Sequence, residues 1–327
     1  MPKSNTLYLS EDGCPFGKQV GEKGAILIEK VWELYNFGVP LFTKAQLRDV
    51  GGRLDNQAKT VLIEGIDGVR VSHDTIRRGK DLQGDVAFIR FHDIQRLVET
   101  PPGSPLPMDR AYCCSLGTSF RKPDDIQRWE NGAACHQLKE ILNSVPLPKS
   151  ITKIVCFALG SLVPIGDWPE RSYRQHVAAL TMVDILKVRT GCDIECYARE
   201  PIYTDICKKV LGSHGVTVLD GAKRFLEVDQ STLGFSVSPN VPVKQIITEL
   251  ARPAIMLWSR VKPEKTEVLA WTKQPYGPEG KYIWVSPHLT DPDSLRVRDM
   301  VQNEYLRFPF PYNLDRLGDL EIYVRKE

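Results

Sequence analysis

Hydrophobic residues follow two different spacings in the middle of this chain, between residues 151 and 260. Short apolar runs, such as Ile154–Leu159, alternate with segments in which apolar residues recur every three or four positions. The runs predict buried strands, and the helical spacing predicts amphipathic helices. The predicted strands are 154–159, 194–197, 216–219, 232–237 and 254–258, and the predicted helices are 172–189, 204–211 and 242–250.

The alternation predicts an α/β fold, because a helix must return the chain before the next parallel strand can form. We expect a Rossmann-like, doubly wound, mostly parallel sheet in residues 151–262, with N-terminal and C-terminal additions. We expect residues 1–150 to form an α+β region that packs on this core and ends at the break Val145-Pro-Leu-Pro148. Residues 263–327 predict an extension that wraps the core. The elements predicted in the two additions are helices 25–35, 124–143 and 294–306 and strands 68–72, 85–91 and 282–285.

The composition is that of an ordinary globular protein, with 42% hydrophobic and 26% charged residues in a chain of 327. Lysine and arginine number 43 against 41 acidic residues, so the formal net charge of +2 gives no overall field to hold a polyanion. Contact with nucleic acid would need local clusters, and the candidates are Arg77-Arg78-Gly-Lys80, Arg121-Lys122 and Lys208-Lys209.

The eight cysteines are scattered without a CxxC pair, which favours reduced thiols in the cytoplasm. Residues 1–20 lack the apolar core of a secretory signal, and no apolar run approaches the roughly 18–20 residues that cross a bilayer. Cys192 and Cys196 have no second pair at zinc-site spacing. We therefore expect a cytoplasmic protein with no membrane segment, no metal and no cofactor. Cys14-Pro15 leaves a thiolate contact to haem open as an alternative.

Candidate chemistry lies at the ends of three predicted strands. In a doubly wound sheet the ligand crevice lies outside the carboxyl ends of the strands, where successive connections diverge to opposite faces. We expect these three strand ends to converge there. They are Gly160-Ser161, residues 197–203 with Glu200 and Tyr203, and residues 236–240 with Ser238 and Asn240.

Each candidate residue has a chemical and a structural interpretation. A serine after a glycine turn can present a nucleophile, although Gly160-Ser161 is equally typical of a simple turn. Neither a GxGxxG fingerprint nor a Walker loop is present. Arg174 and His176, early in the predicted helix, can reach a phosphate or transfer a proton, or can serve packing. Glu200 can bind a cationic group through two parallel hydrogen bonds, or can be an ordinary solvated carboxylate.

Four segments together resemble the sensitivity-to-red-light-reduced domain family, over residues 151–260. They are Ile154–Ser161, Arg174–Leu180, Glu200–Tyr203 and Ser236–Asn240. The segment Ser236-Val-Ser-Pro-Asn-Val-Pro242, followed by Glu249-Leu-Ala-Arg-Pro253, is similar to the filamentous-fungal branch. Plant and animal members usually show a Met-Pro-His-Cys type of ending where this chain has Val237-Ser-Pro-Asn240.

Some members of the fungal branch are similar to arginine-containing cyclodipeptide synthases, which release a diketopiperazine from two aminoacyl-tRNAs. The resemblance implies an aminoacyltransferase that uses arginyl-tRNA and a second aminoacyl-tRNA, needs no cofactor, and accepts the first aminoacyl group on Ser161. We expect His176 and Glu249 to be further catalytic residues. The expected substrate-binding residues are Gly160, Arg174, Glu200, Tyr203, Ser238 and Asn240.

A buried guanidinium needs a carboxylate partner, so an arginine substrate requires an acid in the crevice. Glu200 is the first choice and Glu249 the second, with Asp167 and Glu170 in reserve. Two other functions compete with the synthase. One is a non-catalytic regulatory or haem-binding module, which the same domain family also suggests, and the other is RNA binding without chemistry.

Overall fold

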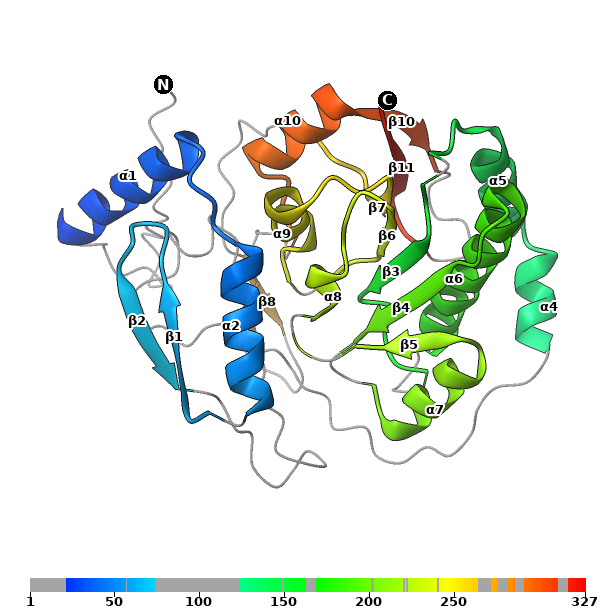
Figure 1. Ribbon diagram of the computed structural model, residues 1–327, viewed down its shortest axis with the longest axis horizontal. Helices are drawn as coiled ribbons and strands as arrows, with labels where there is room; N and C mark the ends of the chain where they lie inside the picture. The colour runs from blue at the N-terminus through cyan, green and yellow to red at the C-terminus, as the bar shows by residue number, and fades with distance from the viewer. Residues whose placement is uncertain are drawn as a thin grey trace.

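The computed structural model describes residues 22–56, 58–74, 124–148, 150–162, 169–200, 203–219, 221, 223–239, 241–263, 272–275, 282–285, 291–310 and 317–327. A seven-stranded sheet crosses the molecule and carries helices on both faces (Figure 1). Its strands are β3 (Lys153–Phe157), β4 (Glu195–Arg199), β5 (Val216–Val218), β6 (Thr232–Ser236), β7 (Ile255–Ser259), β10 (Tyr305–Pro309) and β11 (Leu320–Arg325).

The strand order is β10-β11-β7-β6-β3-β4-β5. The pairs β3–β4, β3–β6, β4–β5 and β6–β7 are parallel, whereas β11 pairs antiparallel with both β7 and β10. If the five parallel strands are numbered 1 to 5 from β3 to β7 along the chain, their order from the β5 edge is 3-2-1-4-5. This is a doubly wound order, and the fold is Rossmann-like as predicted. The order reverses between β3 and β6, which places the expected ligand crevice at the carboxyl ends of these two strands.

Two hydrophobic clusters cover the two faces of the sheet. Helices α5 (Ala133–Ser144), α6 (Pro169–Thr190) and α7 (Asp205–Ser213) pack on one face, against side chains such as Cys156 and Phe235. Helices α2 (Lys44–Asp55), α8 (Lys223–Leu226), α9 (Val243–Leu250) and α10 (Leu295–Glu304) pack on the other, against Phe157 and Trp258. The central strands are apolar on both faces because both faces are covered.

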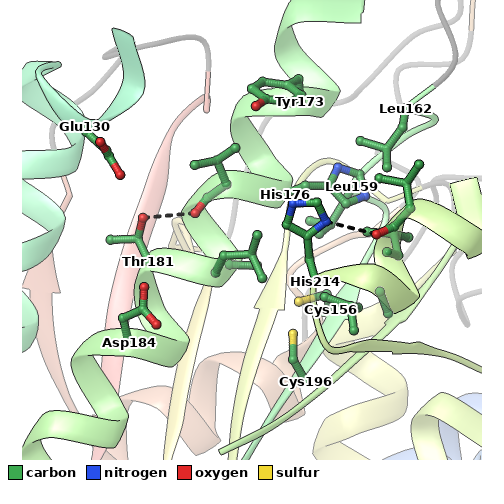
Figure 2. A pocket seen from close by; sticks show the side chains of 17 residues that line it. Glu130, Cys156, Leu159, Leu162, Tyr173, His176, Thr181, Asp184, Cys196 and His214 are labelled. Atoms are coloured by element: carbon green, nitrogen blue, oxygen red, sulfur yellow. Dashed lines mark hydrogen bonds between the residues drawn. The ribbon is translucent and has the colours of Figure 1, made fainter. Parts of the chain in front are cut away.

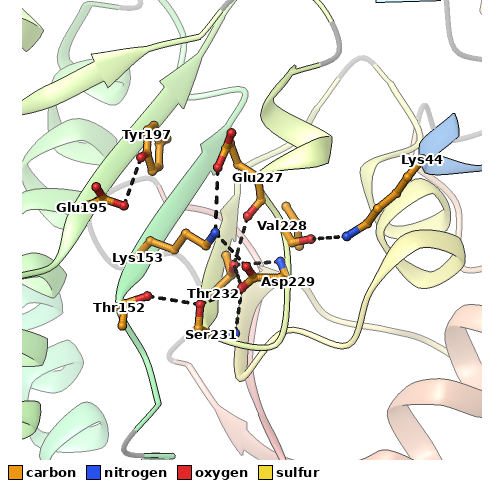
Figure 3. A network of polar contacts seen from close by, with 10 residues as sticks. All are labelled: Lys44, Thr152, Lys153, Glu195, Tyr197, Glu227, Val228, Asp229, Ser231 and Thr232. Atoms are coloured by element: carbon orange, nitrogen blue, oxygen red, sulfur yellow. Dashed lines mark hydrogen bonds and ion pairs between the residues drawn. The ribbon is translucent and has the colours of Figure 1, made fainter. Parts of the chain in front are cut away.

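The amino ends of the strands are joined by a polar network (Figure 3). Nζ of Lys153 on β3 lies 2.8 Å from the Asp229 carboxylate, and that carboxylate also accepts hydrogen bonds from Ser231 and Thr232. Lys44 of α2 donates to the Val228 carbonyl at 3.3 Å. This edge lies opposite the expected crevice, and its contacts fix the loop between α8 and β6.

The N-terminal part adds α1 (Glu22–Asn36), α2 and the antiparallel hairpin of β1 (Thr60–Glu64) and β2 (Arg70–Asp74). The helix expected over 124–143 is two helices, α4 (Asp124–Glu130) and α5, because Gly132 breaks it with an extended backbone at the α5 N-cap. The strand expected at 85–91 lies outside the described residues.

The C-terminal part contributes β8 (Thr272–Pro275) and β9 (Tyr282–Val285), which pair with each other, followed by α10, β10 and β11. Since β11 bonds to β7 along its length, this extension completes the main sheet rather than only wrapping it. Within the part of the chain that the structure describes, no helix has both the length and the apolar character to cross a membrane.

Candidate functional site

The turn that follows β3 has an unusual backbone. Ala158 has a φ of 58° and Gly160 a φ of 75°, so two residues within three positions adopt the left-handed region. A Cβ added to Gly160 would lie 2.1 Å from Oγ and 3.2 Å from Cβ of Ser172 on α6, so any side chain here would force Ser172 to move. Strained backbone of this kind clusters at functional sites, and here it delivers Ser161 to the carboxyl edge of the sheet.

Ser161 is 5% exposed and faces the first turn of α7. Its Oγ lies 3.5 Å from Sγ of Cys207. Burial raises the pKa of the Cys207 thiol, but hydrogen bonds from Thr204, Ser161 and the backbone of Thr204 and Leu162 outweigh it, so the pKa is lowered overall. A helix N-terminus favours a thiolate in the same way. Ser161 and Cys207 therefore form a buried pair of potential nucleophiles.

Glu200 follows β4 and reaches the same turn. The backbone N–H of Gly160 donates to Oε2 of Glu200 at 3.3 Å. Burial raises the pKa of Glu200, while the Gly160 hydrogen bond and the charges of Arg224 and Arg199 lower it in part. The charges of two arginines thus act on this carboxylate.

His176 and Tyr203 form a second buried pair beside the turn. Nδ1 of His176 lies 2.6 Å from the Ser172 carbonyl oxygen, which can only accept, so Nδ1 carries the proton. Nε2 therefore accepts from the Tyr203 hydroxyl at 2.7 Å. Burial lowers the pKa of His176 to about 4, against the opposing effect of the Ser172 carbonyl. Burial also raises the pKa of Tyr203 well above its usual range. Both side chains are neutral near pH 7.

The end of β6 joins this group through Arg171 of α6. Ser238 has a φ of 49°, and its Oγ accepts from the Arg171 guanidinium at 3.1 Å. The Gln175 amide, in the orientation that satisfies both of its ends, donates to the Leu159 carbonyl at 2.9 Å and accepts from Nε of Arg171 at 3.2 Å. The start of α6 therefore links the β3 turn to the β6 turn across the switch point.

A largely apolar cavity of about 410 Å³ lies beside the turn, between the sheet and helices α4, α6 and α7. Leu159 and Leu162, which flank Ser161, form part of its wall together with His176. Figure 2 shows Glu130 and Asp184 on the side of the cavity away from these residues. The cavity is large enough to receive a small ligand or an amino-acid side chain.

The structure brings together six of the residues predicted from the sequence, which are Gly160, Ser161, His176, Glu200, Tyr203 and Ser238. Arg174 is half-buried in α6 near these residues. Glu249 lies elsewhere, because it sits at the far end of α9 and forms an ion pair of 2.5 Å with Arg296 of α10. Asn240, Asp167 and Cys14 lie outside the described residues, as does the side chain of Glu170.

Several neighbours of the site were not predicted from the sequence, namely Cys207, Arg171, Gln175, Arg224, Glu130 and Asp184. The Thr204 cap was one available signal for Cys207, since it places this residue in the first turn of α7. The others come from separate helices whose docking sequence spacing does not encode. Within the described ranges, no three His, Cys, Asp or Glu side chains are grouped to hold a metal ion.

The fold and the site together define a Rossmann-like α/β protein with a polar, partly strained crevice at its switch point. The sequence model of the SRR1 domain family matches residues 138–283. This match supports the resemblance to the sensitivity-to-red-light-reduced domain family for that part of the chain. It gives no support for the resemblance to the fungal cyclodipeptide synthases. No significant match was found among curated proteins or among solved structures.

Proposed function

We propose that the protein is an aminoacyltransferase of the cyclodipeptide-synthase type, which joins arginine and a second amino acid from aminoacyl-tRNAs through an ester on Ser161. The observation that supports it best is the position of Ser161, on a strained turn at the switch point and beside an apolar cavity with carboxylates on its far side. A nucleophile at such a turn and a pocket for the side chain of the acyl group are the two parts that acyl transfer requires.

The reaction would proceed by three exchanges at carbonyl carbon. Oγ of Ser161 attacks the aminoacyl ester, the bond from the acyl carbon to the 3′ oxygen of tRNA breaks, and the serine proton passes to that oxygen. The amine of the second aminoacyl-tRNA then attacks the seryl ester, which forms a peptide bond and restores the serine hydroxyl. Finally the amine of the first residue attacks the remaining ester, which closes the ring and releases the second tRNA.

Neutral His176 and Tyr203 fit a positioning role rather than that of a strong base, because the Nδ1 proton of His176 and the hydroxyl proton of Tyr203 are both already donated within the protein. The His176 ring accepts a hydrogen bond from the Tyr203 hydroxyl, which fixes the phenol and leaves its oxygen lone pairs directed away from the histidine. A weak base is sufficient for the first step, because the ester to tRNA is already activated and the serine proton has an acceptor in the leaving oxygen.

The electrostatics of the site favour Glu130 and Asp184 over Glu200 as partners for an arginine substrate. Glu200 already lies in the field of Arg199 and Arg224, so a third guanidinium there would meet repulsion. The cavity offers apolar walls for the three methylene groups of arginine, and its two acids lie where the guanidinium would emerge. The exposed Lys208-Lys209 pair on α7, next to the cavity residue Val210, provides local positive charge for the tRNA backbone.

The decisive experiment incubates the purified full-length chain with arginyl-tRNA and a mixture of other aminoacyl-tRNAs, and analyses the products by mass spectrometry. We expect an arginine-containing diketopiperazine, and an aminoacylated protein when arginyl-tRNA is supplied alone. Ser161→Ala should abolish both signals, whereas Ser213→Ala, an exposed serine at the end of α7, should keep them. If no charged tRNA yields a diketopiperazine, the synthase proposal fails and a regulatory module becomes the better interpretation.

A further inference from the structure

The sulfur of Cys207 is approached by several hydrogen-bond donors. The hydroxyl of Thr204, the N-cap residue of α7, donates to Sγ of Cys207 at 3.4 Å, and its oxygen accepts from the Cys207 backbone N–H at 3.3 Å. Oγ of Ser161 lies 3.5 Å from the same sulfur. The backbone N–H groups of Thr204 and Leu162 contribute as well. Hydroxyl groups from two separate segments, the turn after β3 and the cap of α7, therefore meet at one sulfur atom.

This arrangement fits a thiolate better than a thiol. A protonated sulfur is a weak acceptor, whereas hydrogen bonds to an ionised acceptor are about twice as strong. Cys207 lies in the first turn of α7, a helix of 9 residues, whose N-terminus also favours negative charge. Burial raises the pKa of the Cys207 thiol, but the hydrogen bonds outweigh it and the net shift is downward. By contrast, burial raises the pKa of the Cys135 thiol.

The other ionisable groups of this region are neutral, exposed or already bonded. Tyr203 and His176 are both neutral near pH 7. On α7 itself Asp205 and Lys208 are exposed, so water and salt screen their charges. The remaining groups, which also act on Tyr203, are Glu200, whose carboxylate accepts a backbone N–H, and the mutually hydrogen-bonded thiols Cys156 and Cys196. The ionisation of Cys207 therefore follows mainly from its burial and its own donors, one of which is Ser161.

We propose that Cys207 is the base that takes the proton of Ser161 when this serine attacks the aminoacyl ester. The inference rests on the proposed function, because it assigns a further catalytic residue to the first step of that reaction. As Oγ of Ser161 bonds to the acyl carbon, the hydroxyl proton moves to Sγ of Cys207. The 3′ oxygen of tRNA leaves with the electron pair of its broken bond and takes this proton from the thiol, which restores the thiolate.

Burial separates the roles of the two side chains. Ser161 is 5% exposed, whereas Cys207 has no exposed surface. The neighbour of Ser161 in the chain, Leu162, also lines the apolar cavity. A substrate carbonyl therefore reaches the serine oxygen before the sulfur, and Cys207 acts on the serine from within the protein.

The test measures acylation of Ser161 in the full chain by two esters, with Ser161→Ala as the background. One ester is p-nitrophenyl acetate, which needs no tRNA, and the other is arginyl-tRNA. Cys207→Ser keeps the size and the hydrogen bonds of the side chain but does not ionise near neutral pH. We expect it to slow acylation by both esters by about a hundredfold or more. Cys192→Ser, an exposed thiol in the loop before β4, should keep the wild-type rate.

The pH dependence of the rate distinguishes a base from a residue that only supports the structure. Wild-type acylation should fall as the pH falls through the ionisation of Cys207, because a protonated thiol cannot take the serine proton. The difference in thiolate ultraviolet absorbance between wild type and Cys207→Ser locates that ionisation. Thr204→Val removes one donor to the sulfur, so it should move both the ionisation and the rate profile to higher pH. This shift decides the matter if Cys207→Ser does not fold.

The possible outcomes separate this proposal from the synthase proposal. A wild-type rate in Cys207→Ser, a Thr204→Val profile that does not move, or an acyl group that peptide mapping finds on Cys207 would overturn the role of Cys207 as the base. Acylation by p-nitrophenyl acetate that depends on Cys207, without any reaction of arginyl-tRNA, would support the base and refute the synthase. If neither ester acylates Ser161, both proposals fail.

Discussion

Gly160 sets the backbone conformation of the turn that precedes Ser161, the candidate nucleophile. Glycine is favoured here for a conformational and a steric reason. Its φ of 75° is costly for other residues, and a Cβ would lie 2.1 Å from Oγ of Ser172. We expect Gly160→Ala to lower the free energy of unfolding by about 2–4 kcal/mol, the sum of strain and overpacking. Urea denaturation followed by circular dichroism measures this loss.

Gly191 supplies a matched control for that substitution. Its φ is 72°, but a Cβ there would meet nothing within 4 Å. Gly191→Ala should therefore cost only the left-handed strain, about 1 kcal/mol. If the two substitutions cost the same, the close approach of Ser172 has no energetic consequence, and the turn is not held as tightly as the contact implies.

His176 makes stability depend on pH. Its pKa is about 4 in the folded protein, below the ordinary value of 6.5, so the unfolded chain binds more protons between these values. Stability is therefore lost as the pH falls from 6.5 to 4, by up to about 3 kcal/mol from this group. Glu200, whose pKa is raised, contributes with the opposite sign.

The contribution of His176 is obtained by comparing variants over that pH range. His176→Gln keeps a polar group in place but does not titrate, so its unfolding free energy should fall less steeply between pH 6.5 and 4. His214→Gln, an exposed histidine on the same side of the molecule, should retain the wild-type slope. Parallel pH profiles for wild type and His176→Gln would contradict a buried neutral imidazole.

Glu130 and Asp184 are the acids that we assign to an arginine substrate, and this assignment has its own test. The double variant Glu130→Gln, Asp184→Asn keeps the shape of the cavity rim and removes both charges. Arginine incorporation should fall by about tenfold or more, because a guanidinium would then lose its charged partners. Asp193→Asn, an exposed acid in the loop before β4, should have no effect. If Glu200→Gln abolishes arginine incorporation and the double variant does not, Glu200 is the partner of the substrate guanidinium, as the sequence predicted.

At the scale of elements, polar contacts hold the loop between α8 and β6 at the amino ends of the strands (Figure 3). The Asp229 carboxylate accepts from the backbone and hydroxyl of Ser231, from Thr232 and from Lys153. Asp229→Ala should lower the free energy of unfolding by about 2–3 kcal/mol, mainly through hydrogen bonds that lose their acceptor. Glu227→Ala, whose contact with Lys153 is 3.8 Å, should cost far less.

Element prediction succeeded where local patterns and tertiary contacts agree. The apolar run at Ile154 and the amphipathic helix over 172–189 are both present, because their buried faces are the ones that the pattern defines. Helix α2 was missed although Thr43 and Gln46 form a capping box that the sequence displays. Strand β10 was predicted partly as the end of a helix, since only its pairing with β11 makes residues 305–309 extended.

At the scale of the whole molecule, the part that matches the SRR1 domain does not include all seven strands of the main sheet. Residues 138–283 end before β11, which bonds to β7 and buries Ile322, Tyr323 and Val324 completely. Each such side chain contributes about 1.5–3 kcal/mol when buried, and their sum approaches the whole stability of a typical domain. We expect a 138–283 fragment to lack cooperative unfolding and dispersed amide resonances, whereas the full chain shows both. A fragment that folds cooperatively would show that β10 and β11 are accessory.

The sequence alone determined the class of this protein. Apolar runs separated by helical spacing require a covered parallel sheet, and the switch point of such a sheet locates the crevice, so Gly160, Ser161, Glu200 and Ser238 could be placed together. The tertiary structure decided which side chains complete the site. Arg224, Glu130 and Asp184 approach from helices far apart in the chain, and Glu249 is held by Arg296, because helix docking depends on packing across the whole fold rather than on local spacing.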